Sequence, residues 1–324
     1  MGFIRVSGLS LVCMGWKTKA RVQNAVSLLP RSLAYSLYYW LQRRYGSLRN
    51  LNPIDGFKAG IETREIINAQ GRDIRDKVIL EIGTGRRINT PIALWLLGAG
   101  KVITVDINPY LKLELVRDDL RYVSENQEEI RALFKNRILE ERFSLLLDAA
   151  RKGLGLAGLL ELFHVRYMAP MDASRLDLPE KSVDYLISYN VFEHIPPGVI
   201  DSILKEGSRV IRDDGLFVHR IDFSDHFAHQ DKSINFVNYL RYDDSEWGRI
   251  VHNHFMYMNR LRVDDMEELF ERAGQRIVSS YPYQHPEVLD LYKRGEIRLA
   301  EKYRHKSEHS ICTIDSWIVS EKRT

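Results

Sequence analysis

The chain has 324 residues, of which 44% are hydrophobic and 28% charged, and its net charge is +3. This length suffices for one α/β domain with additions, and the composition excludes a low-complexity protein. No stretch is long and apolar enough to span a membrane. Two cysteines, Cys13 and Cys312, do not make a disulfide framework, so we expect reduced thiols and a cytoplasmic protein.

Charge is distributed unevenly along the chain. The first acidic residue is Asp55, and eight basic residues precede it, although the whole chain carries only +3. A basic, acid-free segment attached to a mildly acidic body is typical of an interaction arm. We therefore divide the chain into a basic N-terminal helical arm, 1–54, and a main domain, 55–324.

The arm is predicted to contain two helices within residues 19–46, separated by Pro30. The second places Leu33, Leu37 and Trp40 on one face and ends in basic residues. Such a helix can lie in a membrane interface, and this leaves open peripheral contact with the inner face of a membrane. Two other interpretations stay open: a lid that packs over the core or the active site, and a mitochondrial transit peptide.

The next informative segment combines a strand, a glycine turn and a helix. A helix is expected within 55–76, followed by an apolar strand over 78–82 that stops at Gly83 and Gly85. Thr90 is placed to cap the following helix, and Pro91 to occupy its first turn. Glycines at a strand-to-helix turn let a ligand lie against bare backbone.

An acidic residue follows the second predicted strand, 102–105. Asp106 lies about twenty residues beyond the glycine turn, where a carboxylate can accept hydrogen bonds from a ribose diol. A nucleoside-containing ligand is therefore predicted. The dinucleotide fingerprint is incomplete, because Ile88 stands at its third glycine position. Glu81, two residues before Gly83, would repel a pyrophosphate and instead suits a ligand with a cationic amino group.

At this point the chain resembles the class I S-adenosylmethionine-dependent methyltransferases. The acidic residue before G-x-G, the acid after the second strand, the Met171-Asp172-Ala173 segment, the fourth-strand segment 179–188 and the Asn190-to-Pro196 segment occur in the family's order. The resemblance spans roughly residues 76–223. It implies S-adenosylmethionine as cofactor, bound by Glu81, Gly83, Thr84, Gly85, Asp106, Ile107, Asp172, Ala173 and Asn190.

The resemblance also implies the fold. We expect an α/β architecture: a Rossmann-like, seven-stranded methyltransferase sheet with helices on both faces, an N-terminal helical segment and two insertions. The first insertion, about 111–163, has helical spacing of apolar residues and is predicted to be a helical hairpin. The second, about 224–261, is predicted on the acceptor side. A dimer surface or a substrate cap remains open for the first, and a homo-oligomer is one outcome.

The catalytic residues are sought around the second insertion. Half of the ten histidines fall between 219 and 254, among several aromatic residues. Methyl transfer to an alcohol needs a base near the hydroxyl proton, and histidine titrates in the useful range. The candidates for the base or an orienting partner are His219, Asp222, His226 and His229.

His194 is a further catalytic candidate. Glu193-His194 resembles the Glu-His pair of quinone-ring O-methyltransferases, in which a further upstream Glu helps to bind a divalent ion. Asn190 occupies that upstream position here, so the carboxylate set is incomplete and no metal is expected. A divalent ion stays open as an alternative, because histidine and carboxylate clusters bind such ions and Asp222 and His226 have helical spacing.

The arrangement of the second insertion suits a hydroxyl-rich ring, because aromatic residues can stack on its faces while polar residues bind its rim. It also looks like bacterial methyltransferases of polysaccharide and glycolipid biosynthesis. We therefore expect O-methylation of a sugar, a glycan or a lipid-linked sugar. The alternatives are another small molecule, such as a quinone, polyketide or amine, then an RNA methyltransferase, and a cofactor-binding protein without turnover. No nucleic acid is expected as a partner.

Overall fold

The computed structural model describes residues 15–46, 48, 52–253 and 255–323, with the side chains of Arg31 and Ser32 omitted. Cys13 and His254 therefore lie outside the described residues. The chain divides into two compact units. The first unit comprises residues 1–50, 223–263 and 282–315, and the second comprises 51–222, 264–281 and 316–324. The expected boundary after residue 54 lies close to one of these limits, whereas the expected second insertion falls in the first unit.

A seven-stranded sheet forms the centre of the second unit among the described residues, in the order β3-β2-β1-β4-β5-β7-β6. The seven predicted strands are thereby confirmed. Strands β1 to β5 pair in parallel, so their carboxyl ends meet at one edge. The last residues of β6 and the first of β7 belong to the first unit. The strands are β1 Val78–Ile82, β2 Lys101–Val105, β3 Val165–Met168, β4 Val183–Tyr189, β5 Ile211–Asp222, β6 Gln275–Gln284 and β7 Thr313–Lys322.

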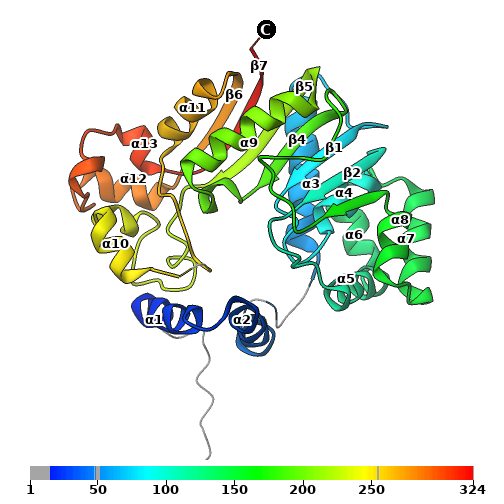
Figure 1. Cartoon of the computed structure of the whole chain (residues 1–324), viewed down its shortest axis with the longest axis horizontal. Coiled ribbons are helices and arrows are strands. Elements are labelled where there is room, and N and C mark those ends of the chain that lie inside the picture. Colours follow the sequence, from blue (N-terminus) through cyan, green and yellow to red (C-terminus); the bar gives the residue numbers. More distant parts are fainter. Residues whose placement is uncertain (1–14, 47, 49–51, 254, 324) are drawn as a thin grey trace, which may run out of the picture. The chain divides into compact units, whose positions relative to one another are not determined.

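Helices cover both faces of this sheet (Figure 1). Side chains alternate between the faces of a strand. Tyr185 and Ile187 of β4 join the core that contains Phe57 of α3, whereas Leu186 faces Gly207 of α9. Expected helices on both faces are thus confirmed. Their bounds are α3 Ile54–Ala69, α4 Asn89–Leu96, α9 Pro197–Val210 and α11 Val263–Arg272.

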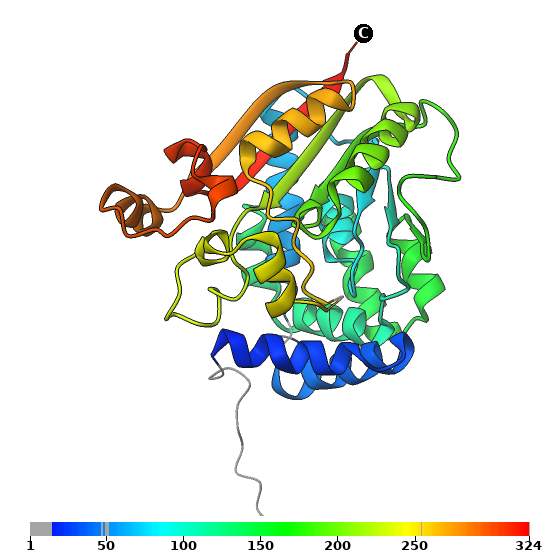
Figure 2. The same cartoon turned by 60° about the vertical axis from the view of Figure 1, so that its left-hand side comes forward.

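Four helices, rather than the predicted hairpin, lie between β2 and β3 in the described chain; they are coloured teal to green in Figures 1 and 2. Leu120, Ile130 and Phe143 from these helices are buried in the main core of the second unit. The insertion therefore elaborates the scaffold through apolar packing. The four are α5 Leu113–Glu125, α6 Gln127–Leu133, α7 Glu140–Lys152 and α8 Leu156–Leu162.

The first unit has a separate core built from three distant segments. Trp16 of α1 stacks on Trp247 of α10 with ring centroids 6.2 Å apart, and Phe227 packs beside both. The two predicted arm helices are confirmed, with Pro30 preceding the second. The elements are α1 Trp16–Ser27, α2 Arg31–Tyr45, η3 Asn238–Arg241, α10 Asp244–Ile250, α12 Pro286–Lys293, η4 Glu301–Tyr303 and α13 Glu308–Cys312.

A buried arginine joins the segments of the first unit. Arg262 is fully buried, and its guanidinium donates to the carbonyl oxygens of residues 223, 310, 311 and 313 and to the hydroxyl of Tyr239. Five donors in a fixed fork suit this role, because each orphaned carbonyl would otherwise cost free energy.

None of the described helices combines the length and the hydropathy that a membrane crossing requires.

Candidate cofactor and catalytic site

The β1–α4 loop has two glycines in left-handed backbone conformations, Gly83 at φ +92° and Gly85 at φ +64°. A Cβ on Gly83 would lie 2.5 Å from Cγ2 of Val191, whereas a Cβ on Gly85 would meet no atom within 4 Å. The two glycines therefore have different roles. Gly83 is required by packing inside the protein, and Gly85 is the one with open space for a ligand.

The helix after this loop begins two residues earlier than predicted. Its N-cap is Ile88, with no capping side chain, so the prediction that Thr90 caps it is wrong. Thr90 instead donates to the Gly56 carbonyl at 3.4 Å, which joins α4 to α3. Pro91 does occupy the first turn, where its missing N–H costs nothing.

Glu81 is buried at the end of β1. Its carboxylate accepts a 2.5 Å hydrogen bond from Thr104 of β2, and Thr84 lies 2.7 Å from the Thr104 hydroxyl oxygen. Burial raises the pKa of Glu81 to about 7, although the hydrogen bond from Thr104 opposes that change. A buried carboxylate with this pKa would gain from a nearby cation, such as the amino group of the predicted cofactor.

Asp106 organises the loops at the carboxyl end of β2. Its two carboxylate oxygens accept the backbone N–H groups of Gly85 and Asn108, each at 2.9 Å. Burial raises the pKa of Asp106, and these two hydrogen bonds oppose the increase. The next residue, Ile107, is 68% exposed, so an apolar side chain is available beside the acid.

The third predicted cofactor segment is tied to Asp106 through the backbone. Met171 N–H donates to the Asp106 carbonyl at 2.9 Å. Asp172 is exposed and accepts hydrogen bonds from the N–H and hydroxyl of Ser174, while Ala173 is buried. The structure thus brings this segment next to the acid after β2, and its contact with the cofactor stays a prediction.

Asn190 supplies a polar atom without a protein partner. It has a left-handed backbone at φ +54°, directly after β4, and its N–H donates to the Arg220 carbonyl at 2.9 Å. Its side-chain oxygen is buried and accepts no hydrogen bond from the described residues. A buried acceptor without a donor is costly, so a ligand N–H or O–H would stabilise this position.

These residues fit S-adenosylmethionine. Open space lies at Gly85, carboxylates lie at Glu81 and Asp106, an exposed apolar side chain lies at Ile107, and an unsatisfied acceptor lies at Asn190. Glu81 lies in β1, and the others come from loops at the carboxyl ends of β1, β2 and β4, which are adjacent in the sheet. Their individual roles in binding remain predictions.

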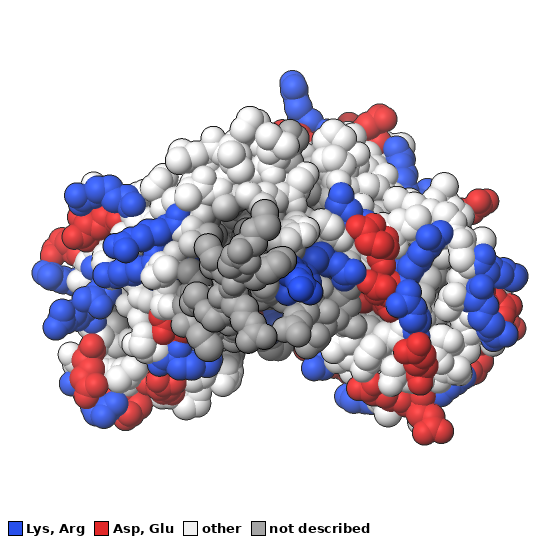
Figure 3. Space-filling model, turned by 90° about the horizontal axis from the view of Figure 1, so that it is seen from below, with Lys and Arg blue, Asp and Glu red and all other residues white. Residues whose placement is uncertain are grey.

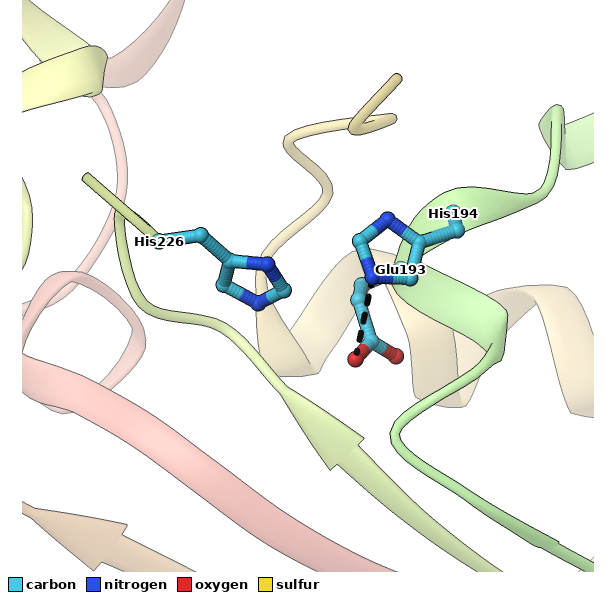
Figure 4. A group of neighbouring side chains, drawn as sticks. All are labelled: Glu193, His194 and His226. Carbon is cyan, nitrogen blue, oxygen red and sulfur yellow. Dashed lines mark ion pairs between the residues drawn. The ribbon is translucent and has the colours of Figure 1, made fainter. Parts of the chain in front are cut away.

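His194 and Glu193 project from the short helix η2 Phe192–His194 after β4 (Figure 4). His194 Nε2 lies 3.9 Å from Glu193 Oε1, with the imidazole partly exposed and the carboxylate buried. This pair can hold or move a proton. Its catalytic role stays a prediction.

His219 occupies a different environment from the one expected of a base. It is fully buried on β5, stacks on Phe192 with centroids 4.4 Å apart, and lies near Phe270. Its Nδ1 is 2.7 Å from the Ser188 hydroxyl oxygen, and burial lowers its pKa to about 3. This position in an aromatic core gives no support to the prediction that His219 is a base.

His226 and His229 lie together in the first unit, with ring centroids 5.9 Å apart. Asp225 beside them is fully buried and accepts hydrogen bonds from Phe227 N–H at 2.9 Å and from Asn238 at 3.1 Å. Burial raises the pKa of Asp225 to about 6, and the two histidines oppose that increase. The sequence analysis did not select Asp225, although its position next to His226 was a usable signal. Asp222, the fourth candidate, is the last residue of β5.

A second polar group, which the sequence analysis missed, lies at the carboxyl ends of β4 and β5. Glu62 of α3 accepts hydrogen bonds from the Tyr189 hydroxyl at 2.9 Å and from Arg220 at 3.0 Å. The Arg220 guanidinium lies 4.7 Å from the Tyr189 ring centroid. Burial raises the pKa of Glu62, and Arg220 opposes the increase. Tyr189 and Arg220 could have been found as strand ends, but nothing in the sequence pairs them with Glu62.

The chain matches one family model and is similar to several solved structures. Residues 61–280 match the family model described as a methyltransferase domain. No curated protein matches the chain. Among solved structures, the chain is similar to the PH0226 protein of Pyrococcus horikoshii, with 15% identity, a TM-score of 0.48, and 88% and 98% of the two chains covered. It is also similar to an S-adenosylmethionine-dependent methyltransferase of Mesorhizobium loti, with 12% identity, a TM-score of 0.42, and 80% and 96% covered.

The glycine loop, the acid after β2 and the order of the strands define a methyltransferase of the Rossmann-like class. Because the family model covers more than half of the residues, this chain belongs to the methyltransferase domain family. It is an S-adenosylmethionine-dependent methyltransferase, as the motifs predicted.

Proposed function

We propose that the chain transfers the methyl group of S-adenosylmethionine to a hydroxyl of a sugar or glycan, including a sugar linked to a lipid. The observation that carries this proposal is the group of Asp225, His226 and His229. A buried carboxylate beside two imidazoles is suited to accept and hold a proton, which an alcohol must lose during methylation.

The chemistry needs few groups. When bound, the cofactor supplies an electrophilic methyl group on a sulfonium. The acceptor oxygen forms a bond to that carbon, the carbon–sulfur bond breaks with its electrons left on sulfur, and the hydroxyl proton goes to a base. His226 is the proposed base, and the Asp225 carboxylate stabilises the resulting imidazolium electrostatically. Positioning of the acceptor supplies much of the remaining rate.

The polar group of Glu62, Tyr189 and Arg220 favours a hydroxyl-bearing acceptor over an apolar one. A carboxylate, a guanidinium and a phenol offer both donors and acceptors at the edge of the sheet where the cofactor loops lie. A quinone or polyketide would be better served by an apolar lining with few polar groups.

An RNA acceptor is a weaker candidate. On the face shown in Figure 3, acidic side chains stand among the basic ones along both margins. Phosphate backbones favour surfaces where basic residues are not offset in this way.

The test combines binding and turnover on the purified chain. S-adenosylmethionine binding is measured by calorimetry, and methyl transfer is then measured against sugars, lipid-linked sugars, catechols, quinols and amines. We expect turnover with hydroxyl-bearing sugars. His226→Ala should lower kcat about 100-fold or more without weakening cofactor binding.

Tyr257→Ala, a change at a partly exposed side chain of the same unit, serves as a control for nonspecific damage. Turnover confined to quinols or amines would replace the sugar as acceptor. Cofactor binding with unchanged turnover in His226→Ala would remove this residue from the mechanism.

A further inference from the structure

The α1–α2 hairpin, residues 16–45, carries an exposed apolar ridge. Leu28 is 80% exposed, Leu33 59%, Leu37 37% and Trp40 54%. On α2, residues 33, 37 and 40 follow the i, i+4, i+7 spacing of a single helix face. Large apolar side chains gathered in one short segment mark an interaction surface.

The charge of the hairpin indicates what could cover this ridge. Lys17, Arg21 and Arg44 are exposed, and the chain has no acidic residue before Asp55. Apolar and aromatic side chains flanked by exposed cations complement an anionic lipid surface. Figure 2 shows α1 and α2 as adjacent blue helices, and contacts between them agree with this view.

A cavity of about 220 Å³ lies in the same hairpin, and most of its lining is apolar or aromatic. Val22 and Val26 line it from α1, and Tyr38, Leu41 and Tyr45 line it from α2. A slot of this kind, with apolar walls contributed by both helices, suits a hydrocarbon chain.

Two polar groups in the slot are suited to a lipid head group. Gln23 is 97% buried; its amide nitrogen is 3.3 Å from the Tyr38 hydroxyl, but its side-chain oxygen has no partner among the described residues. Lys19 donates to Gln230 at 2.7 Å, and burial lowers the pKa of this ammonium group. The unsatisfied oxygen of Gln23 would gain from a lipid hydroxyl. The Lys19 ammonium group hydrogen-bonds to a neutral amide, and it would gain from a phosphate in addition to the favourable charge of Asp225.

The slot and the ridge are connected. Tyr45 lines the slot, and its ring contacts Trp40 of the ridge edge-on, with centroids 5.9 Å apart at 78°. A lipid chain in the slot would therefore emerge beside the side chains that face outward.

We propose that the α1–α2 hairpin binds the surface of an anionic lipid bilayer. The ridge of Leu28, Leu33, Leu37 and Trp40 enters the interface, and the slot receives the chain of one anionic lipid with its phosphate near Lys19. This binding needs neither cofactor nor acceptor, so it can succeed or fail separately from the proposed methyl transfer.

Tryptophan fluorescence offers a direct test. Four of the five tryptophans are at most 8% exposed, and Trp40 is the exception. The full chain is mixed with vesicles of phosphatidylcholine, with and without phosphatidylglycerol. We expect a blue shift of the emission and cosedimentation with the anionic vesicles, both weakened by salt. Trp40→Phe should lose the shift and keep most of the binding.

Three variants locate the surface. Leu33→Ser with Leu37→Ser should weaken vesicle binding at least 10-fold. Lys19→Gln should reduce the preference for anionic over neutral vesicles, while Glu301→Gln, at an exposed acid of the same unit, should change neither. Folding of each variant is checked by circular dichroism and by cofactor affinity.

Two results would overturn the proposal. One is a folded, cofactor-binding chain that ignores anionic vesicles at low salt. The other is concentration-dependent self-association that the two leucine substitutions abolish, with no lipid effect, because the ridge would then pair two copies of this chain.

Discussion

The two units hold their segments together in different ways. In the second unit, strands β1 to β5 come from one continuous segment and pair in a parallel sheet, so the loops after them meet at one edge. In the first unit, three distant segments share an aromatic core around Trp16 and Trp247. Short sequence motifs therefore indicate the function of the second unit. The structure of the first unit depends on contacts between distant segments, which no local sequence pattern predicts.

Polar groups show the same contrast. In the second unit, Glu81, Asp106 and Asn190 lie at strand ends, at the edge of the sheet where the cofactor is predicted to bind. In the first unit, the Arg262 guanidinium donates its hydrogen bonds to backbone carbonyl oxygens of the same unit. In the second unit, polar groups lie at an edge of the sheet where a ligand could bind them. In the first unit, the polar groups of Arg262 are used to join segments of the chain.

The largest expected effect concerns Arg262. Arg262→Met leaves several buried carbonyls without donors, and we expect the free energy of unfolding to fall by about 3 kcal/mol or more. Thermal and urea unfolding measure the change. S-adenosylmethionine affinity should change by no more than about 2-fold, because Arg262 joins segments of the first unit, whereas the predicted cofactor residues belong to the second.

Arg272→Met is the matched control, because its side chain is 66% exposed. An equal loss of stability in this variant would show that arginine removal, rather than the buried network, is responsible. Loss of cofactor binding in a folded Arg262→Met protein would show that cofactor binding in the second unit depends on the hydrogen bonds of Arg262 in the first.

The second effect concerns Asp106. Asp106→Ala removes the predicted ribose acceptor and also the anchor for the Gly85 and Asn108 N–H groups. Loss of charge-assisted hydrogen bonds should weaken S-adenosylmethionine binding about 100-fold. Calorimetry measures it, with the exposed Asp177→Ala as control. Affinity within error of the unsubstituted chain would rule out Asp106 as a ligand.

The sequence could predict the sheet because its signals are local. The apolar run ending at Gly83 and the acid after β2 each need only a few neighbouring residues. The four helices in place of a hairpin could not be predicted, since turns within a long amphipathic stretch leave weak signals. Burial of His219 depended on Phe192 and Phe270, which are distant in sequence and pack around it only in the folded chain.

The candidate site shows the same limit. Motif positions placed Glu81, Asp106, Asp172 and Asn190 at the carboxyl edge, although their contacts with a cofactor remain predictions. The pairing of Glu62 with Arg220 was missed because α3 lies more than 150 residues earlier in the chain. Sequence spacing cannot indicate which helix residue meets a strand end.

The third prediction concerns pH. Because the pKa of Glu81 is raised to about 7, the folded chain without ligand retains this proton below that pH. A cationic amino group on the cofactor favours the ionised carboxylate, so binding releases the proton. Affinity should therefore weaken up to about 10-fold for each pH unit below 7, as a shift of one unit corresponds to 1.36 kcal/mol.

Calorimetry between pH 5.5 and 8.5 in buffers of different ionisation enthalpy would count the released protons. Glu81→Gln should bind more weakly at pH 8 and show a flat profile. The sign for folding is opposite: a carboxyl group with a raised pKa makes the folded state less stable as pH rises from about 4.5 to 7. An unchanged pH profile in Glu81→Gln would mean that another group carries the linkage.

The smallest effect separates packing from binding within the glycine loop. Gly83→Ala should lower the free energy of unfolding by about 2 kcal/mol, because its Cβ would clash with Val191 at a positive φ. Gly85→Ala also has a positive φ but meets open space, so it should cost only about 1 kcal/mol. The added methyl group of Gly85→Ala would occupy space expected for the cofactor.

Calorimetry and urea unfolding on both variants should therefore show the larger stability loss for Gly83→Ala and the larger ratio of affinity loss to stability loss for Gly85→Ala. The reverse pattern would mean that the cofactor lies against Gly83, and that Val191 moves aside when it binds.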